Sequence, residues 1–212
     1  MDTRKIAVVA SVAAVALALS GCNAGNAEGP TASPTEASKS SSAPGSTSAP
    51  PSPSNTEKYE PATAKGPAQN VPVPKMPEAA KVKSKEGAAE FTRYYFDLIN
   101  YTAETTKTGP IKNVTSRSCK LCAEAIIDSA DESASVGEWQ VGGEYKASVI
   151  DSYISAPGRA IVTARFSAEP FDTYIVPDSV VAEYSEVKSS LSTFQLSFDT
   201  KWTVEDLLVA EE

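Results

Sequence analysis

Apolar side chains are distributed unevenly along the 212-residue chain. Residues 6–19 form a nearly continuous apolar run, residues 23–74 contain few large apolar side chains, and after residue 77 apolar and polar positions alternate with regular periods. A short apolar run, an unpatterned polar stretch and a periodic region are typical of different structures. The pattern therefore predicts a leader (1–21), a disordered tether (22–75) and one folded domain (76–212).

The first part of the periodic region has the period of an amphipathic helix. Ser84 is a suitable N-cap, and Gly109-Pro110 is expected to stop the helix. Positions of the expected buried face recur at spacings of three and four residues, at Phe91, Tyr95, Leu98, Ile99 and Thr102. A second helix is expected to begin near Ser116 or Ser118 and to end in an acidic stretch.

After Gly137 the period changes to two, which predicts β-strands. The expected turns are Pro157-Gly158 and Asp199-Thr200, and residues 180–190 are left open between a long loop and a sixth strand. The alternating runs are 145–153, 160–166, 171–176, 194–198 and 202–204. Helices followed by hairpin-spaced strands predict an α+β fold, with two N-terminal helices packed on a curved antiparallel sheet of about five strands.

The tether is predicted from its composition. Ser, Thr, Pro, Ala and Gly dominate between residues 23 and 74. Such a segment cannot bury enough apolar surface to offset the entropy lost on ordering. We therefore expect a spacer that holds the folded domain away from its point of attachment.

The start of the chain has the three zones of an export signal. Arg4 and Lys5 precede an apolar run of about 14 residues, and Leu19-Ser20-Gly21 supplies small residues before Cys22. The run is shorter than the roughly 20 residues that a membrane-spanning helix needs. The segment therefore predicts export.

Leu19-Ser20-Gly21-Cys22 resembles the lipobox of bacterial lipoproteins. That resemblance implies cleavage before Cys22, a diacylglyceryl group on its thiol and modification with palmitate. The protein would then be anchored to the extracytoplasmic face of the cell membrane. The alternative is an ordinary signal peptide followed by an incidental cysteine.

Composition narrows the chemistry that is available. The chain contains no histidine, which excludes Ser-His-Asp and Cys-His catalysis and every zinc site that uses histidine. The net charge is −8, and it becomes −9 when Asp2, Arg4 and Lys5 leave with the leader. An acidic surface does not suit nucleic acid. We expect no metal and no cofactor.

Cys119 and Cys122 are the most distinctive local signal, because an i, i+3 pair outside the cytoplasm is expected to be oxidised. Three interpretations remain open. The pair is a structural disulfide that pins the second helix, a redox-active pair at a helix N-terminus, or part of a metal site. Zinc needs four ligands, and this pair supplies only two thiols.

Helices followed by curved strands that end on a Trp-x-Val strand resemble the NTF2-like (SnoaL-like) cone. A narrower resemblance is carried by Gly87, Phe91, Tyr94, Tyr95, Gly109, Cys119-Lys-Leu-Cys122 and Trp139-Gln-Val-Gly142-Gly143. At these positions the chain resembles a family of actinobacterial lipoproteins, domain of unknown function 6318. This resemblance implies a fold and a location, and no reaction.

Cone-shaped folds often hold small ligands between helices and sheet. On that analogy Tyr94, Asp97, Tyr101 and Trp139 are candidates for a pocket, and the alternative is that they are surface or core residues. We expect a non-enzymatic binding module for an envelope protein, a cell-wall polymer or a small ligand. The alternative is a thiol–disulfide oxidoreductase that uses Cys119 and Cys122.

Overall fold

The computed structural model describes residues 58–211, which form one α+β unit. The leader, Cys22 and the tether up to residue 57 lie outside the described residues. The helical elements are η1 (Glu78–Lys81), α1 (Lys85–Thr105), α2 (Gly109–Lys112), the π-helical η2 (Cys122–Asp128) and α3 (Ser129–Val136). The strands are β1 (Trp139–Gly142), β2 (Tyr145–Ala156), β3 (Arg159–Ala168), β4 (Phe171–Val176), β5 (Ser179–Tyr184), β6 (Val187–Phe198) and β7 (Trp202–Glu211).

Helix α1 forms as its sequence pattern predicts. Ser84 is the N-cap, and its hydroxyl oxygen accepts a hydrogen bond from the Gly87 amide at 3.1 Å. The helix ends at Thr105, because Thr106 takes a left-handed conformation (φ 57°). All five positions of the predicted buried face are buried. The N-cap and the amphipathic stripe are therefore confirmed.

The helical region after α1 is divided into three elements, α2, η2 and α3, where the sequence predicted a single second helix. Helix α1 ends at Thr105, before Gly109-Pro110. Gly109-Pro110 instead begins α2, because the fixed backbone angle of proline suits the first turn of a helix. The second helical run starts after Cys119, later than Ser116 or Ser118, and passes through η2 before α3. Cys122 and Ile127, the two buried residues of η2, are five residues apart, the spacing at which π-helical hydrogen bonds close.

Seven strands form two antiparallel sheets, instead of one sheet of about five strands. The four-stranded sheet has the order β2-β3-β6-β7, and the three-stranded sheet has the order β1-β4-β5. Strand β5 and the start of β6 occupy residues 180–190, the stretch left open by the sequence. The turns at Pro157-Gly158 and Asp199-Thr200 join β2 to β3 and β6 to β7 as predicted.

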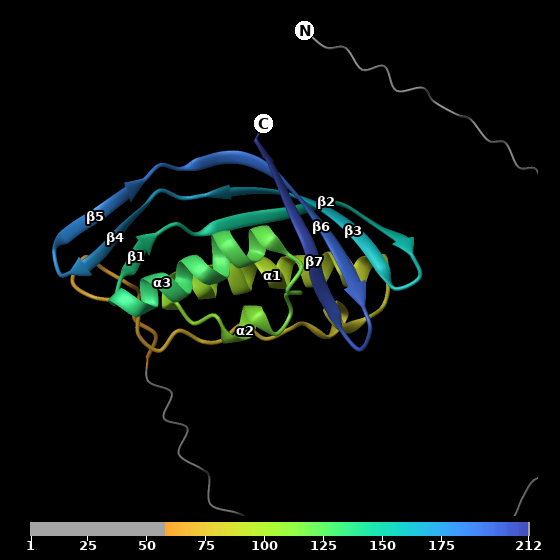
Figure 1. Ribbon diagram of the computed structural model, residues 1–212, viewed down its shortest axis with the longest axis horizontal. Helices are drawn as coiled ribbons and strands as arrows, with labels where there is room; N and C mark the ends of the chain where they lie inside the picture. The colour runs from red at the N-terminus through yellow and green to blue at the C-terminus, as the bar shows by residue number, and fades with distance from the viewer. Residues whose placement is uncertain (1–57, 212) are drawn as a thin grey trace, which may run out of the picture. The chain divides into compact units, whose positions relative to one another are not determined.

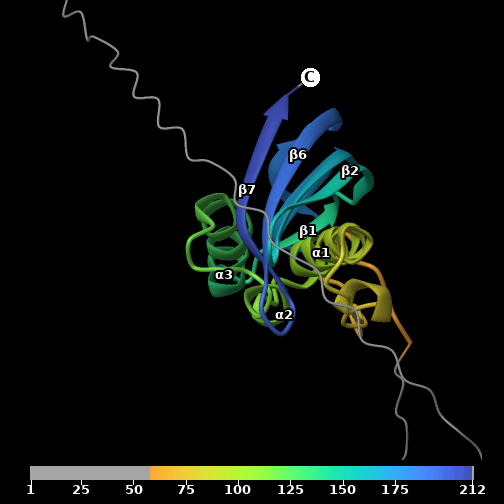
Figure 2. The ribbon, with the colours of Figure 1, turned by 90° about the vertical axis from the view of Figure 1, so that its right-hand side faces the viewer.

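The strands arch over α1 and α3, with β1, β4 and β5 toward one end and the four-stranded sheet toward the other (Figure 1). Seen from the side, the far ends of β6 and β7 extend beyond the helices (Figure 2). The main hydrophobic core lies between α1 and the inner face of the four-stranded sheet. Its largest fully buried side chains include Trp202, Tyr95, Phe91, Phe194 and Leu98.

Residues 58–75, which composition assigns to the tether, are part of the folded unit. Glu60 pairs with Gln69 and Thr63 with Gly66, which makes a small hairpin. The Thr63 carbonyl accepts a hydrogen bond from the Trp139 indole at 2.9 Å. The predicted domain boundary at residue 76 is thus too late. Backbone hydrogen bonds hold this segment, and hydrophobic periodicity does not report them.

Candidate functional site: a cavity beneath the three-stranded sheet

A cavity of about 410 Å³ lies between α1, the helical residues 125–136 and strands β1, β4 and β5, and Tyr145 at the start of β2 also lines it. This volume falls in the range typical of small-molecule sites. Its apolar wall comes mainly from the helices and includes Ile99, Ala103, Ala125, Ile126, Ala130 and Val136. The main core ends where this cavity begins, because no residue of β1, β4 or β5 belongs to the described core cluster.

Aromatic side chains form the wall on the sheet side. Trp139 is only 7% exposed, and its ring stacks on Tyr174 with the centroids 5.7 Å apart. Phe171 and Tyr184 stack on each other at 4.3 Å across β4 and β5. Three of these rings, those of Trp139, Phe171 and Tyr184, line the cavity. Stacked aromatic rings therefore form this side of the cavity.

Two buried hydroxyl groups on this cavity have no hydrogen-bond partner. Thr102 of α1 is 1% exposed and Thr173 of β4 is 7% exposed, and both line the cavity. Neither Oγ1 atom makes a hydrogen bond within the described part of the chain. On the same helix, Thr92 is equally buried, but its hydroxyl donates to the Ala88 carbonyl at 3.0 Å. The missing bond of Thr102 is thus a property of its position.

The charged groups that line the cavity are all acidic. Glu132 of α3 and Glu138, which follows that helix, contribute carboxylates, and no lysine or arginine is among the lining residues. The Ser133 hydroxyl donates to Glu138 Oε2 at 3.2 Å. The cavity therefore combines apolar and aromatic walls with hydroxyl groups and negative charge.

The four residues proposed from the sequence do not form one site. Trp139 lines the cavity. Tyr94 and Asp97 line a separate surface hollow of about 380 Å³, and Tyr101 is buried without lining either space. Burial raises the pKa of the Asp97 carboxyl, and burial together with the charge of Asp97 raises the pKa of Tyr94.

The cavity residues that sequence reasoning missed lie on several distant elements. They are Glu132, Glu138, Phe171, Thr173 and Tyr184. Thr102 was recognised only as part of the buried helix face. No local pattern distinguishes these residues, because β1 and β5 were not expected and the cavity exists only once the helices meet these strands.

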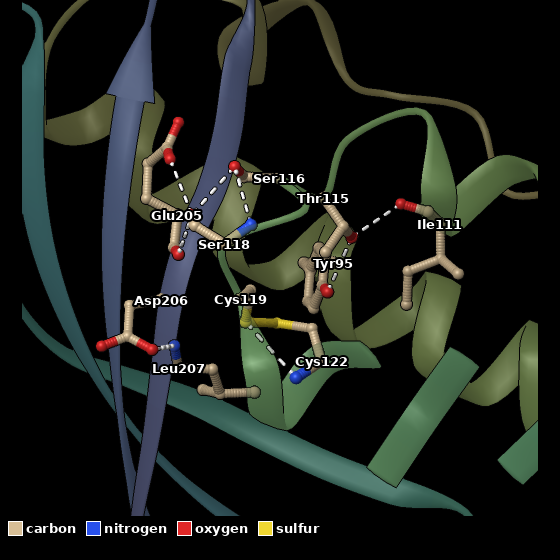
Figure 3. The surroundings of a disulfide bond; sticks show 10 residues. All are labelled: Tyr95, Ile111, Thr115, Ser116, Ser118, Cys119, Cys122, Glu205, Asp206 and Leu207. Carbon is tan, nitrogen blue, oxygen red and sulfur yellow. Dashed lines mark hydrogen bonds between the residues drawn. A yellow bond between two sulfur atoms is a disulfide. The ribbon is translucent and has the colours of Figure 1, made fainter. Parts of the chain in front are cut away.

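Cys119 and Cys122 form a disulfide, with their Cα atoms 5.3 Å apart. Both residues are fully buried and belong to the main core. Figure 3 shows the bond beside β7, where the Ser118 hydroxyl donates to the Glu205 carbonyl at 2.9 Å. Neither cysteine lines the cavity. The disulfide therefore constrains the start of the helical segment η2–α3, which forms one wall of the cavity.

Within residues 58–211, no three histidine, cysteine, aspartate or glutamate side chains lie together in a way that could hold a metal ion. Within the same residues, no helix has the length and apolar character required to cross a membrane.

Comparison with known proteins gives a family and two distant structural likenesses. The model of a family of unknown function, DUF6318, matches residues 57–207. No curated protein matches the chain. The intermembrane space region of the chloroplast protein ARC6 is 15% identical with a TM-score of 0.47, over 62% of this chain and 99% of that one. A domain of unknown function with a cystatin-like fold from Nostoc punctiforme is 13% identical with a TM-score of 0.36, over 62% and 79%.

Proposed function

Because the chain belongs to the DUF6318 family, for which no function is known, we propose a role from its own geometry: a non-enzymatic binding module that holds a small ligand in the cavity. The observation that carries this proposal is the pair of unpartnered hydroxyls, Thr102 and Thr173, on one cavity. They come from α1 and β4, so a single ligand group contacted by both would join helix and sheet.

The two hydroxyl groups also give an energetic argument for a ligand. A buried hydroxyl without a partner destabilises a fold by about 1–3 kcal/mol. Native proteins retain few such groups, and each one calls for a structural reason. A ligand that forms a hydrogen bond with these hydroxyl groups removes this destabilisation. The apolar part of the same ligand packs against Ile99 and Ile126. Ligand binding would then explain why these two buried hydroxyl groups have no partner within the protein.

We also propose that the arch of strands over α1 and α3 is an NTF2-like cone, with the cavity at its mouth. Its support is the position of the cavity between the helices and the concave side of the strands. Sites of this kind are usually preformed and mostly apolar. The stacked pairs Trp139–Tyr174 and Phe171–Tyr184 give this cavity a preformed wall.

The burial of the disulfide argues against a thiol–disulfide oxidoreductase. Exchange requires a thiolate to reach one of the two sulfur atoms. Cys119 and Cys122 are both 0% exposed and lie in the main core. A structural disulfide is the interpretation that fits this position.

We place the binding module outside the membrane, anchored by lipid on Cys22, with residues 23–57 as its spacer. The support is the leader, the resemblance to a lipobox and the composition of the spacer. Replacing Cys22→Ala in the native host is expected to move the protein from the membrane fraction to the soluble fraction. Retention of the variant in the membrane fraction would contradict the anchor.

The indole N–H resonances of the two tryptophans can report ligand binding, because one indole lies at the cavity and the other in the core. The Trp139 indole lines the cavity and donates to the Thr63 carbonyl, whereas the Trp202 indole lies in the core and donates to the Val82 carbonyl at 2.9 Å. A fragment library added to ¹⁵N-labelled protein is expected to shift the Trp139 indole N–H resonance and leave that of Trp202 in place. The Trp139→Phe variant assigns the two signals.

Variants of the two hydroxyls then locate the bound fragments. Thr102→Val and Thr173→Val are each expected to weaken binding of polar fragments about tenfold, the effect of one lost hydrogen bond to a buried group. Thr92→Val is the matched control, because Thr92 is as buried as Thr102 but bonds to its own helix. The proposal would be overturned if Thr102→Val and Thr173→Val left the fragment affinities unchanged. It would also be overturned if no fragment shifted the Trp139 resonance.

A further inference from the structure

We infer that the ligand of this cavity is an organic cation: an ammonium group attached to an apolar body. The inference rests on the proposed function and adds the chemical class of the ligand. The geometry that points to it is the meeting of two carboxylates, those of Glu132 and Glu138, with four aromatic rings around one cavity. The rings belong to Trp139, Tyr145, Phe171 and Tyr184.

The charge of the cavity lining is one-sided. Glu132 and Glu138 carry its only carboxylates, and no lysine or arginine is among the lining residues. No ion pair within residues 58–211 joins either carboxylate to a lysine or arginine. Lys112, on α2, is held by Asp131 of α3 at 2.7 Å. A ligand cation would thus meet two carboxylates that lack a protein counterion, whereas an anion would be repelled.

The backbone adds to the same field. Helix α3 ends at Val136, and the Gly137 C-cap (φ 71°) turns the chain so that Glu138 follows at once. The carbonyl end of a helix carries partial negative charge. Glu138 therefore lies next to a helix terminus that also attracts cations.

The aromatic wall provides the second element of cation recognition. Cations are attracted to the electron-rich faces of aromatic rings, and the attraction is stronger where the contact is shielded from water. Trp139 is buried at the wall, while Tyr184 is 50% exposed and so reaches solvent. A buried ring and an exposed ring, next to carboxylates that have no lysine or arginine partner, suit an ammonium group. The helix side, with Ile99 and Ile126, suits the apolar body.

The buried hydroxyls give the independent evidence that this acidic cavity is a site. Thr102 and Thr173 are more than nine-tenths buried and have no partner within the described residues. Acidic residues at a surface are usually solvated and need no ligand. Here the same cavity leaves both hydroxyls unsatisfied, so its occupant must fill the interior as well as meet the carboxylates.

Three probes with one carbon skeleton test the charge of the ligand: 3-phenylpropylamine, 3-phenylpropan-1-ol and 3-phenylpropionate, titrated at pH 7 and low salt while the Trp139 indole resonance is followed. We expect the amine to bind about tenfold more tightly than the alcohol, and the carboxylate to bind most weakly. Added salt is expected to weaken the amine more than the alcohol.

The double variant Glu132→Gln/Glu138→Gln is expected to reduce the affinity of the amine to that of the alcohol and to leave the alcohol unchanged. The double variant Glu124→Gln/Asp128→Asn is the matched control. It also removes two negative charges from the helical run, and neither Glu124 nor Asp128 lines the cavity. An equal loss in this control would show that net charge alone attracts the amine, which overturns the inference.

The failures of the two proposals are distinguishable. If the alcohol binds as tightly as the amine, or the carboxylate binds most tightly, the ligand is not a cation and the cavity remains a binding site. If none of the three probes shifts the Trp139 resonance at millimolar concentration, both the cation and the small-ligand pocket are wrong.

Discussion

The two sheets of this domain differ in what they cover. The four-stranded sheet places alternate side chains of β3 and β6 into a dense core against α1, where Phe194 contacts Tyr95 and Phe96 edge-on. The three-stranded sheet covers a cavity, and its outer strand β5 has no fully buried residue. If the cavity binds a ligand as proposed, stability and ligand binding depend on different parts of the same helix.

Helix α1 takes part in both regions. Its residues Phe91 and Tyr95 pack into the core, and Ile99 and Thr102, one to two turns later, line the cavity. If stability and binding are separate, substitutions under the four-stranded sheet will lower stability most, and substitutions under the three-stranded sheet will change binding most. The following predictions test this difference in order of expected effect.

The largest effect is expected for Phe194→Ala. Phe194 is fully buried and contacts two aromatic rings, so its removal is expected to lower the free energy of unfolding by about 3–5 kcal/mol. Phe171→Ala, at the half-buried cavity wall, is expected to lower it by less than half as much and to weaken fragment binding. Denaturant titrations of both variants make the comparison, and equal losses of stability would contradict it.

The next effect appears at alkaline pH. Burial raises the pKa of Tyr95 to about 12, and its hydroxyl lies 2.9 Å from Thr115 Oγ1. A raised pKa means that the folded state favours the protonated phenol. This contribution is complete below about pH 10 and is lost as the pH rises toward 12. The loss is roughly 2–3 kcal/mol.

Tyr95→Phe isolates that contribution from the other tyrosines of the domain. The variant keeps the ring in the core, and its free energy of unfolding is expected to fall less steeply between pH 10 and 12 than that of the wild type. Denaturation at pH 7 sets the baseline for each protein. Parallel curves above pH 10 would mean that Tyr95 ionises as easily in the folded state as in the unfolded chain.

Removal of the disulfide ranks third. The bond closes a very small loop, so Cys119→Ala/Cys122→Ala is expected to lower the free energy of unfolding by about 2 kcal/mol. Fragment affinity is expected to stay within about twofold of wild type, because neither cysteine lines the cavity. A large loss of affinity with little loss of stability would show that the bond serves the cavity more than the core.

The smallest predicted effect has the opposite sign. Thr102→Val removes a buried hydroxyl that has no partner and keeps the shape of the side chain, so it is expected to raise the free energy of unfolding by about 1 kcal/mol. Thr92→Val removes a satisfied hydroxyl from the same helix and is expected to lower it by about 1 kcal/mol. Thermal and chemical denaturation of the ligand-free variants check the two signs. Destabilisation by Thr102→Val would mean that its hydroxyl is already satisfied.

Local sequence determined much of the core region. The period of α1, the Ser84 cap and the turns at Pro157-Gly158 and Asp199-Thr200 are each fixed by neighbouring residues. The four-stranded sheet follows, because its long strands alternate strongly and hairpins join them in pairs. The i, i+3 spacing of Cys119 and Cys122 likewise predicts the disulfide that the structure contains.

Tertiary structure alone decided the cavity region. The 58–75 hairpin and β1 are short and held mainly by backbone pairing, and β5 lacks the alternation of a half-buried strand. The candidate pocket residues on α1 were wrongly grouped with Trp139, because successive helix residues point about 100° apart and only the packing of α1 decides which face meets the cavity. Thr102, and not Tyr101, lies there. The hydrophobic period of the sequence thus determined the core under the four-stranded sheet. The cavity depends on how elements distant in sequence pack together, because their side chains leave a space between them.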